Sequence, residues 1–162
     1  MSNITEQSLH RIMVATFEEL GLVVPDVELS PEQLEEPVDA AVSVAFRGPL
    51  SGRLILSASS KILPGLAANM LGTDNPDEAT QRDALGELAN VICGNLLPQV
   101  AGADVVFSLS APQWFHTVDS KPDPRYSLAG AAALGIDEGR ATAQVLLFGD
   151  KSSALEMRAN AA

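Results

Sequence analysis

The stretch Asp83-Ala-Leu-Gly-Glu87-Leu-Ala-Asn90-Val-Ile-Cys-Gly94-Asn95 carries the strongest pattern in this sequence. On an α-helix, which turns by about 100° per residue, Asp83, Glu87, Asn90 and Gly94 fall on one narrow stripe. Apolar residues fill the opposite side, namely Ala84, Leu85, Leu88, Val91 and Ile92. A core helix needs only its apolar side. A carboxylate and a carboxamide one turn apart, with a glycine beside them, therefore form a candidate functional surface that faces away from the core.

The residues around this stretch predict where the helix begins and ends. We expect it to span about 77–96, with Asn75 as the N-cap and Pro76 at the first helical position. The acidic residues that follow favour the first turn of a helix. Pro98 has no backbone N–H, so it should stop the helix or kink it.

Hydrophobic periodicity predicts the other elements. Further helices are expected over 4–20 and 60–72, a hairpin over 40–58, and strands over 104–110, 126–134 and 140–148. The proline-containing segment 24–37 indicates an exposed connector with a helical turn at 32–35. The last strand is apolar on both faces, which is typical of a central strand or of a contact between subunits. This order predicts an α+β fold, an antiparallel sheet with amphipathic helices packed on one face.

Length and composition indicate one globular domain. The chain has 162 residues, of which 46% are hydrophobic and only 4% aromatic. A single domain over 1–150 is therefore expected, with an aliphatic core and a polar C-terminal tail over 151–162.

The charge of the chain limits its partners. A net charge of −11 argues against nucleic acid and against an anionic membrane surface, because both require clustered Lys and Arg. The single cysteine, Cys93, cannot form an internal disulfide, and the N-terminus lacks the basic and apolar regions of a signal peptide. No apolar run reaches the roughly 20 residues that span a bilayer. The expected location is the cytoplasm.

Several kinds of active site have no motif in this sequence. There is no GxxxxGK[ST] or GxGxxG loop for a nucleotide, no HExxH or Cys/His cluster for zinc, and no GxSxG elbow. Neither His10 nor His116 belongs to a recognisable catalytic arrangement of acidic and nucleophilic residues. We therefore expect no cofactor and no metal on this chain. From its pattern alone, the polar stripe could also be an ordinary solvated helix face.

The motif Asp83-x3-Glu87-x2-Asn90, followed by Gly94-Asn95 and later by Pro112, resembles the signature of the CheX/CheC/FliY family of chemotaxis phosphatases. The resemblance covers about residues 42–114 and implies a CheC/CheX-like pseudo-symmetric fold. Because the Glu-x2-Asn motif occurs once, the chain resembles CheX more than CheC. The interval 91–111 before Pro112 is one residue shorter than is usual in the family, which suggests a trimmed loop.

The resemblance implies a protein phosphatase that hydrolyses the aspartyl phosphate of a CheY-type response regulator. The regulator supplies its own acids, Mg²⁺ and Lys. By this resemblance, Asn90 orients the attacking water and Glu87 pairs with the regulator's Lys, so these two are the catalytic residues. Asp83, Gly94 and Pro112 are expected to bind the partner, and Gly94 and Cys93 to allow its close approach.

Two alternatives of another class remain open at this point. The chain could be a non-catalytic domain that binds a response regulator or forms a dimer, or a scaffold like those of the flagellar switch. CheX-like dimers that exchange sheet edges make a homodimer plausible. The sequence identifies neither the regulator nor the pathway, which need not be motility.

Overall fold

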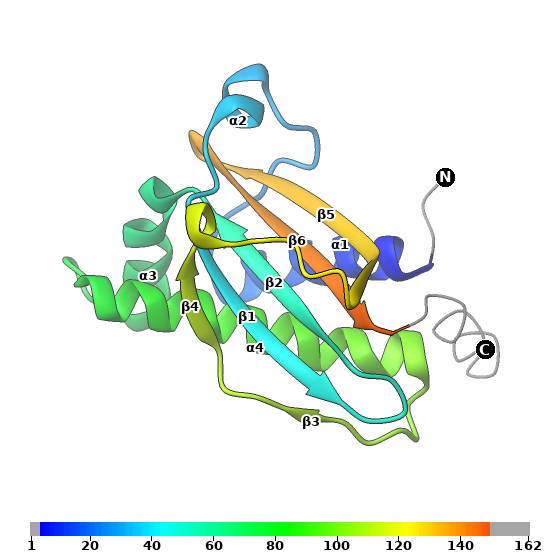
Figure 1. Cartoon of the computed structure of the whole chain (residues 1–162). Coiled ribbons are helices and arrows are strands. Elements are labelled where there is room, and N and C mark those ends of the chain that lie inside the picture. Colours follow the sequence, from blue (N-terminus) through cyan, green and yellow to red (C-terminus); the bar gives the residue numbers. More distant parts are fainter. Residues whose placement is uncertain (1–3, 150–162) are drawn as a thin grey trace.

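The computed structural model describes residues 4–149 and shows a sheet with helices on one side (Figure 1). Its helices are α1 (Ile4–Glu19), α2 (Pro31–Glu35), α3 (Leu63–Leu71) and α4 (Glu78–Ala101), with short 3-10 turns η1 (Ser60–Ile62) and η2 (Thr117–Asp119). Its strands are β1 (Ala40–Arg47), β2 (Gly52–Ala58), β3 (Ser108–Leu109), β4 (Gln113–His116), β5 (Tyr126–Ile136) and β6 (Gly139–Phe148). The predicted tail over 151–162 lies outside the described residues.

The strands form one antiparallel sheet in the order β3-β1-β2-β6-β5, and β4 also pairs with β1. The predicted hairpin is confirmed, because β1 and β2 pair from Ala40 opposite Ala58 to Phe46 opposite Gly52. Gly52 is needed there, since a Cβ at this position would overlap the Leu146 carbonyl oxygen of β6. Strand β6 lies between β2 and β5. Its two apolar faces therefore belong to a central strand.

Helices α1 and α4 cover one face of the sheet, and α3 packs against α4 beside it (Figure 1). Helix α1 packs on β5 and on α4, while α4 packs on β1 and β2. The core between the two layers is mainly aliphatic, with Phe17 and Phe46 as its largest fully buried side chains. The α+β class with helices on one face is thus confirmed. The opposite face, which carries Ser43, Ile55 and Gln144, is called the helix-free face below.

The strand predicted over 104–110 is mostly wrong. Only Ser108–Leu109 forms a strand there, and the longer pairing with β1 comes from Gln113–His116, which was not predicted as a separate strand. The two short strands follow one edge of β1 in succession. Pro112 lies between them and has no backbone N–H to donate to β1.

Helix α4 differs from its prediction at both ends. Asp77, not Asn75, is the N-cap, and its carboxylate accepts a hydrogen bond of 2.8 Å from the backbone N–H of Thr80. The helix also continues through Pro98 to Ala101. The carbonyl that loses its partner belongs to Gly94, and both Gly94 and Pro98 are exposed. Water can hydrogen bond to this carbonyl, while the buried side chains of Leu97, Val100 and their neighbours hold the last turn on the core.

The remaining helical predictions agree with the structure. The turn expected at 32–35 is α2, which begins with a capping box between Ser30 and Gln33. The helix expected over 60–72 is η1 followed by α3, with Pro64 in the first turn of α3. It ends at Gly72, which has a positive φ of 67° that favours glycine.

Candidate functional site

The predicted polar stripe lies on the outer side of α4. Asp83, Glu87 and Gly94 are exposed, and Asn90 is half-buried. On the opposite side of the helix, Ala84, Leu85, Leu88 and Ile92 are buried in the core, whereas Val91 is only partly buried. The helical pattern therefore separated the two sides of α4 correctly except at Val91.

The polar side chains of the stripe have no partner within the part of the chain that the structure describes. Asp83, Glu87 and Asn90 make no side-chain hydrogen bond or ion pair to residues 4–149. Hydrogen bonds within residues 4–149 therefore do not account for the presence of these carboxylate and carboxamide groups on α4. Their donors and acceptors are available to a molecule that approaches α4 from outside.

Pro112, far from the stripe in sequence, lies against the same helix. A Cβ built on Gly86 would lie 3.1 Å from the Cβ of Pro112 and 3.2 Å from its Cγ. Gly86 lies three residues after Asp83 and four before Asn90, so Pro112 packs beside the stripe. The structure thus brings together Asp83, Glu87, Asn90, Gly94 and Pro112. It also shows that Gly86, which sequence reasoning did not select, makes room for the proline.

Gly94 and Cys93 have opposite environments. Apart from its chain neighbours and the backbone of its own helix, no atom of residues 4–149 lies within 4 Å of a Cβ built on Gly94, so a partner could approach the backbone there. Cys93 instead points into the core with an exposed fraction of 1%, so the expectation that it allows a partner's close approach is wrong. Burial raises the pKa of the Cys93 thiol to about 12. This thiol is therefore neutral and is no candidate nucleophile.

Two further residues beside the stripe were missed. Arg82 on α4 places its guanidinium carbon 4.9 Å from the ring centroid of Trp114 on β4. Its Nη2 is also 2.7 Å from a carboxylate oxygen of Glu78. The only signal in the sequence is that Trp114, the single tryptophan, follows Pro112 by two residues. The contact with Arg82 depends on how β4 is placed against α4.

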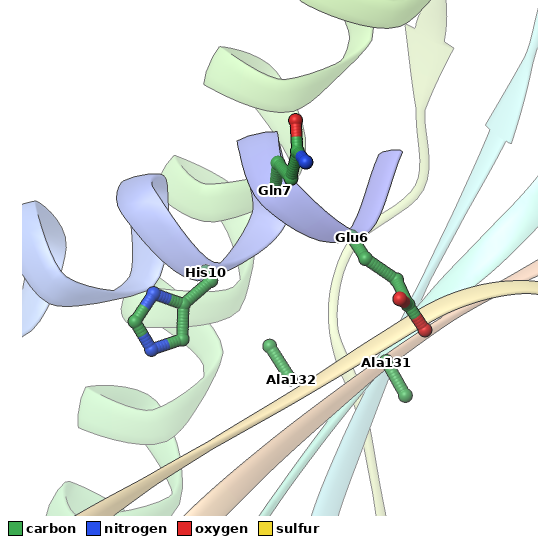
Figure 2. A pocket seen from close by; sticks show the side chains of 5 residues that line it. All are labelled: Glu6, Gln7, His10, Ala131 and Ala132. Atoms are coloured by element: carbon green, nitrogen blue, oxygen red, sulfur yellow. The ribbon is translucent and has the colours of Figure 1, made fainter. Parts of the chain in front are cut away.

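A shallow pocket of about 340 Å³ lies elsewhere, between α1 and β5 (Figure 2). It is lined by Glu6, Gln7, His10, Ala131 and Ala132. The imidazole of His10 projects from α1 on the side where β5 runs. His10 itself is half-buried. No residue of the α4 stripe lines this pocket. The pocket and the stripe are thus separate features of the surface.

Residues 4–149 show neither a metal-binding cluster nor a helix suited to crossing a membrane. They contain no group of three or more His, Cys, Asp or Glu side chains arranged to hold a metal ion. None of the helices in the same part of the chain combines the length and apolar character that crossing a membrane requires.

Solved structures with a similar fold include CheX, CheC-like, FliY and FliM proteins. CheX from Vibrio vulnificus has a TM-score of 0.66 and 14% identity, covering 90% of this chain and 99% of that one. A CheX–CheY–BeF3–Mg²⁺ complex from Borrelia burgdorferi has a TM-score of 0.61 and 14% identity, covering 89% and 97%. FliY from Thermotoga maritima has a TM-score of 0.59 and 14% identity, covering 100% and 99%. At these identities the likeness concerns the fold.

The family itself is shown by the sequence. The family model described as chemotaxis phosphatase CheX matches residues 40–124, just over half of the chain. This chain belongs to the CheX family. A search of curated proteins gave no match. The matched segment runs from β1 to the loop after η2 and includes the whole of α4 and Pro112.

Proposed function

We propose that this protein accelerates hydrolysis of the aspartyl phosphate on a CheY-type response regulator, with the α4 stripe entering the regulator's active site. The observation that carries this proposal is the pair of outward side chains, Glu87 and Asn90, which have no hydrogen-bond partner within residues 4–149. Membership of the CheX family supports it. Such regulators are cytoplasmic, so this function would place the protein there.

The chemistry that this reaction needs from the chain is small. An acyl phosphate is already labile, so positioning the water and stabilising charge supply most of the acceleration. The Asn90 carboxamide would accept a hydrogen bond from the attacking water and donate one elsewhere, which orients the water without removing its proton. The regulator's own Mg²⁺ would neutralise charge on the phosphoryl oxygens. This chain would need no metal of its own.

Glu87 would act as the anchor. Its carboxylate lies almost one turn before Asn90 on the same stripe, so it can pair with a regulator lysine while Asn90 reaches the phosphoryl group. That lysine would otherwise pair with the phosphate. Pro112 beside Gly86, the open backbone at Gly94 and the carboxylate of Asp83 would complete the surface that receives the regulator.

The direct test is dephosphorylation of CheY-type regulators from the same genome, loaded with acetyl phosphate. Wild-type protein should accelerate loss of the phosphoryl group from at least one regulator. Glu87→Ala and Asn90→Ala should each lower that acceleration at least about tenfold, the loss of about 1.4 kcal/mol of transition-state stabilisation. Asn75→Ala, an exposed amide that is not the N-cap, is the matched control and should leave the rate unchanged.

Two results would count against parts of this proposal. No acceleration with any regulator would remove the enzymatic function, and unchanged acceleration in both variants would remove the site assignment. The non-catalytic alternative predicts a different result. A protein of that kind, whether a regulator-binding domain, a dimerisation domain or a scaffold, would form complexes without turnover. Size-exclusion chromatography with light scattering would show whether this chain forms the homodimer that we also propose.

A further inference from the structure

Arg82 is the only Lys or Arg residue on α4, whose other charged residues are the acids Glu78, Asp83 and Glu87. Two contacts hold its guanidinium in place: the ion pair of 2.7 Å with Glu78 and the stacking over Trp114. The Nε of Arg82 and the indole Nε1 of Trp114 are both buried and have no hydrogen-bond partner among residues 4–149. The side chain of Arg82 nevertheless remains 40% exposed. The cation is thus fixed in position and still accessible from outside.

The position of Arg82 relates it directly to Asn90. Arg82, Gly86 and Asn90 are spaced i, i+4 and i+8, so they form one row along the helix that extends over about 12 Å. Pro112 packs on the middle of this row at Gly86, and Trp114 meets its end at Arg82. A partner that takes the Asn90 side chain into its own active site and covers Pro112 would also reach the Arg82 guanidinium.

The positive charge of Arg82 matters because the surface around the stripe is acidic. The chain carries a net charge of −11, and Asp83 and Glu87 add carboxylates to the stripe. The partner expected from the proposed function also carries acids and a phosphoryl group around its active site, so the two surfaces would repel each other. Exposed ion pairs such as Arg82–Glu78 contribute little to folding stability. A cation held by two neighbours at the margin of the stripe is better explained by its electrostatic attraction of an approaching acidic surface.

We propose that Arg82, held by Glu78 and Trp114, pairs with an acidic side chain on the rim of the regulator's phosphorylation site and so selects and orients the partner. This inference rests on the proposed function, because it takes the same regulator as its partner. Arg82 acts here as a positioning and specificity residue. Its contribution falls on association and leaves the bond-breaking step to Asn90 and the regulator.

The test measures association separately from turnover. The probe is a dye-labelled CheY-type regulator activated with beryllofluoride and Mg²⁺, which binds without being hydrolysed, and anisotropy follows its binding over a range of salt concentrations. At low salt, Arg82→Gln should lower the association rate constant by about three- to tenfold, and the difference should vanish at high salt. Arg82→Lys should restore most of the rate, and kcat at saturating phosphorylated regulator should stay within about twofold of wild type.

The matched control is Lys121→Gln, which removes one positive charge from the loop beside the helix-free face. It should leave the association rate and its salt dependence close to wild type. Equal rates for Arg82→Gln and wild type at low salt would overturn the inference. Equal losses in Arg82→Lys and Arg82→Gln, together with a lower melting temperature in both, would also overturn it, because the role of Arg82 would then be structural.

The same data distinguish failure of this inference from failure of the proposed function. Wild-type binding without turnover would contradict the phosphatase, while a salt-dependent loss in Arg82→Gln would still support the role of Arg82. Normal turnover with no effect of Arg82→Gln would contradict the role of Arg82 alone. Absence of wild-type binding to every activated regulator would overturn both.

Discussion

Gly94 and Gly86 lie on the same helix, yet a methyl group meets different surroundings at each. Beyond its own helix and chain neighbours, no atom of residues 4–149 lies within 4 Å of a Cβ at Gly94, so a methyl group there meets no clash. Because alanine has the better helix propensity, Gly94→Ala should raise the free energy of unfolding by about 0.5–1 kcal/mol. Where a regulator approaches this backbone, the same methyl group should weaken its binding. Urea unfolding and the dephosphorylation assay measure the two effects. A gain in stability with unchanged kcat/KM would show that the partner does not contact Gly94.

Gly86→Ala is the comparison. Its Cβ would lie 3.1 Å from that of Pro112, a contact tighter than ordinary van der Waals distance, so the proline must move. The gain in stability should therefore be smaller than for Gly94→Ala, and kcat/KM should fall because Pro112 no longer lies in its place beside Glu87. An equal gain in stability at both positions would mean that Pro112 moves without cost.

The buried thiol of Cys93 makes a separate prediction. Because burial raises its pKa to about 12, almost no thiolate is present near neutral pH. We expect Cys93 to resist iodoacetamide at pH 8 in the native protein and to react once urea unfolds the chain. Mass spectrometry of timed samples measures this. Fast labelling of native protein would show that the segment around Cys93 opens readily.

Helix α4 as an element predicts a contrast between its two sides. Leu88 is fully buried, so Leu88→Ala should lower the free energy of unfolding by about 2–5 kcal/mol through lost burial and the cavity that remains. Asn90→Ala should change it by no more than about 0.5 kcal/mol, since Asn90 makes no hydrogen bond within residues 4–149. Urea titrations of both variants measure the contrast. Strong destabilisation by Asn90→Ala would make Asn90 structural and would remove its role with water.

How far each element could be predicted depends on where its determinants lie. The period of 3.6 residues gave the two sides of α4 from its own sequence, and the alternation in residues 40–58 gave the hairpin of β1 and β2. The end of α4 could not be predicted this way, because packing of its last turn on the core outweighs the cost of Pro98. The bounds of β3 and β4 could not be predicted from local sequence either, because their pairing with β1 joins segments far apart in the chain.

The candidate site shows the same division. Glu87 and Asn90 were predictable because they are neighbours on one helix, and their spacing alone places them on one side. Gly86 and Arg82 were not predictable because their importance comes from Pro112 and Trp114, which the chain brings back only after the segment 102–111. A helix-only pattern therefore found the half of the surface that α4 supplies. The other half of the surface, which β4 and the residues before it supply, could be recognised only from the folded structure.

In the molecule as a whole, hydrogen bonds lower the pKa values of two carboxyl groups, Asp39 and Asp123. Burial raises the pKa of Asp39, but hydrogen bonds of 2.8 Å from the backbone N–H and the hydroxyl of Ser60 lower it. Together with smaller contributions from its own backbone N–H and from His116, they leave this pKa below its ordinary value. Hydrogen bonds from Arg125 lower the pKa of Asp123 to about 2. Asp39 joins the start of β1 to η1, and Asp123 lies in the loop beside the helix-free face.

The sign of the pH dependence follows from these directions. A carboxyl group with a lower pKa in the folded state stabilises the fold above its unfolded pKa of about 3.9, and this contribution is lost as the pH falls toward the folded value. The free energy of unfolding should thus decrease as the pH is lowered from about 5 toward 2. Asp39→Asn should be less stable than wild type at pH 7 and should lose less stability on acidification. Urea titrations at a series of pH values measure both effects.

Ser60→Ala provides the control for this assignment because it removes the hydroxyl donor and leaves the Asp39 carboxylate in place. It should weaken part of the same pH dependence, since the backbone N–H of residue 60 still donates to Asp39. In the double variant Asp39→Asn/Ser60→Ala, the pH dependence should match that of Asp39→Asn alone, because the hydroxyl acts through the carboxylate. If Asp39→Asn keeps the full acid sensitivity of wild type, the link between β1 and η1 is not a source of that sensitivity, and the carboxylate of Asp123 in the loop becomes the next group to test.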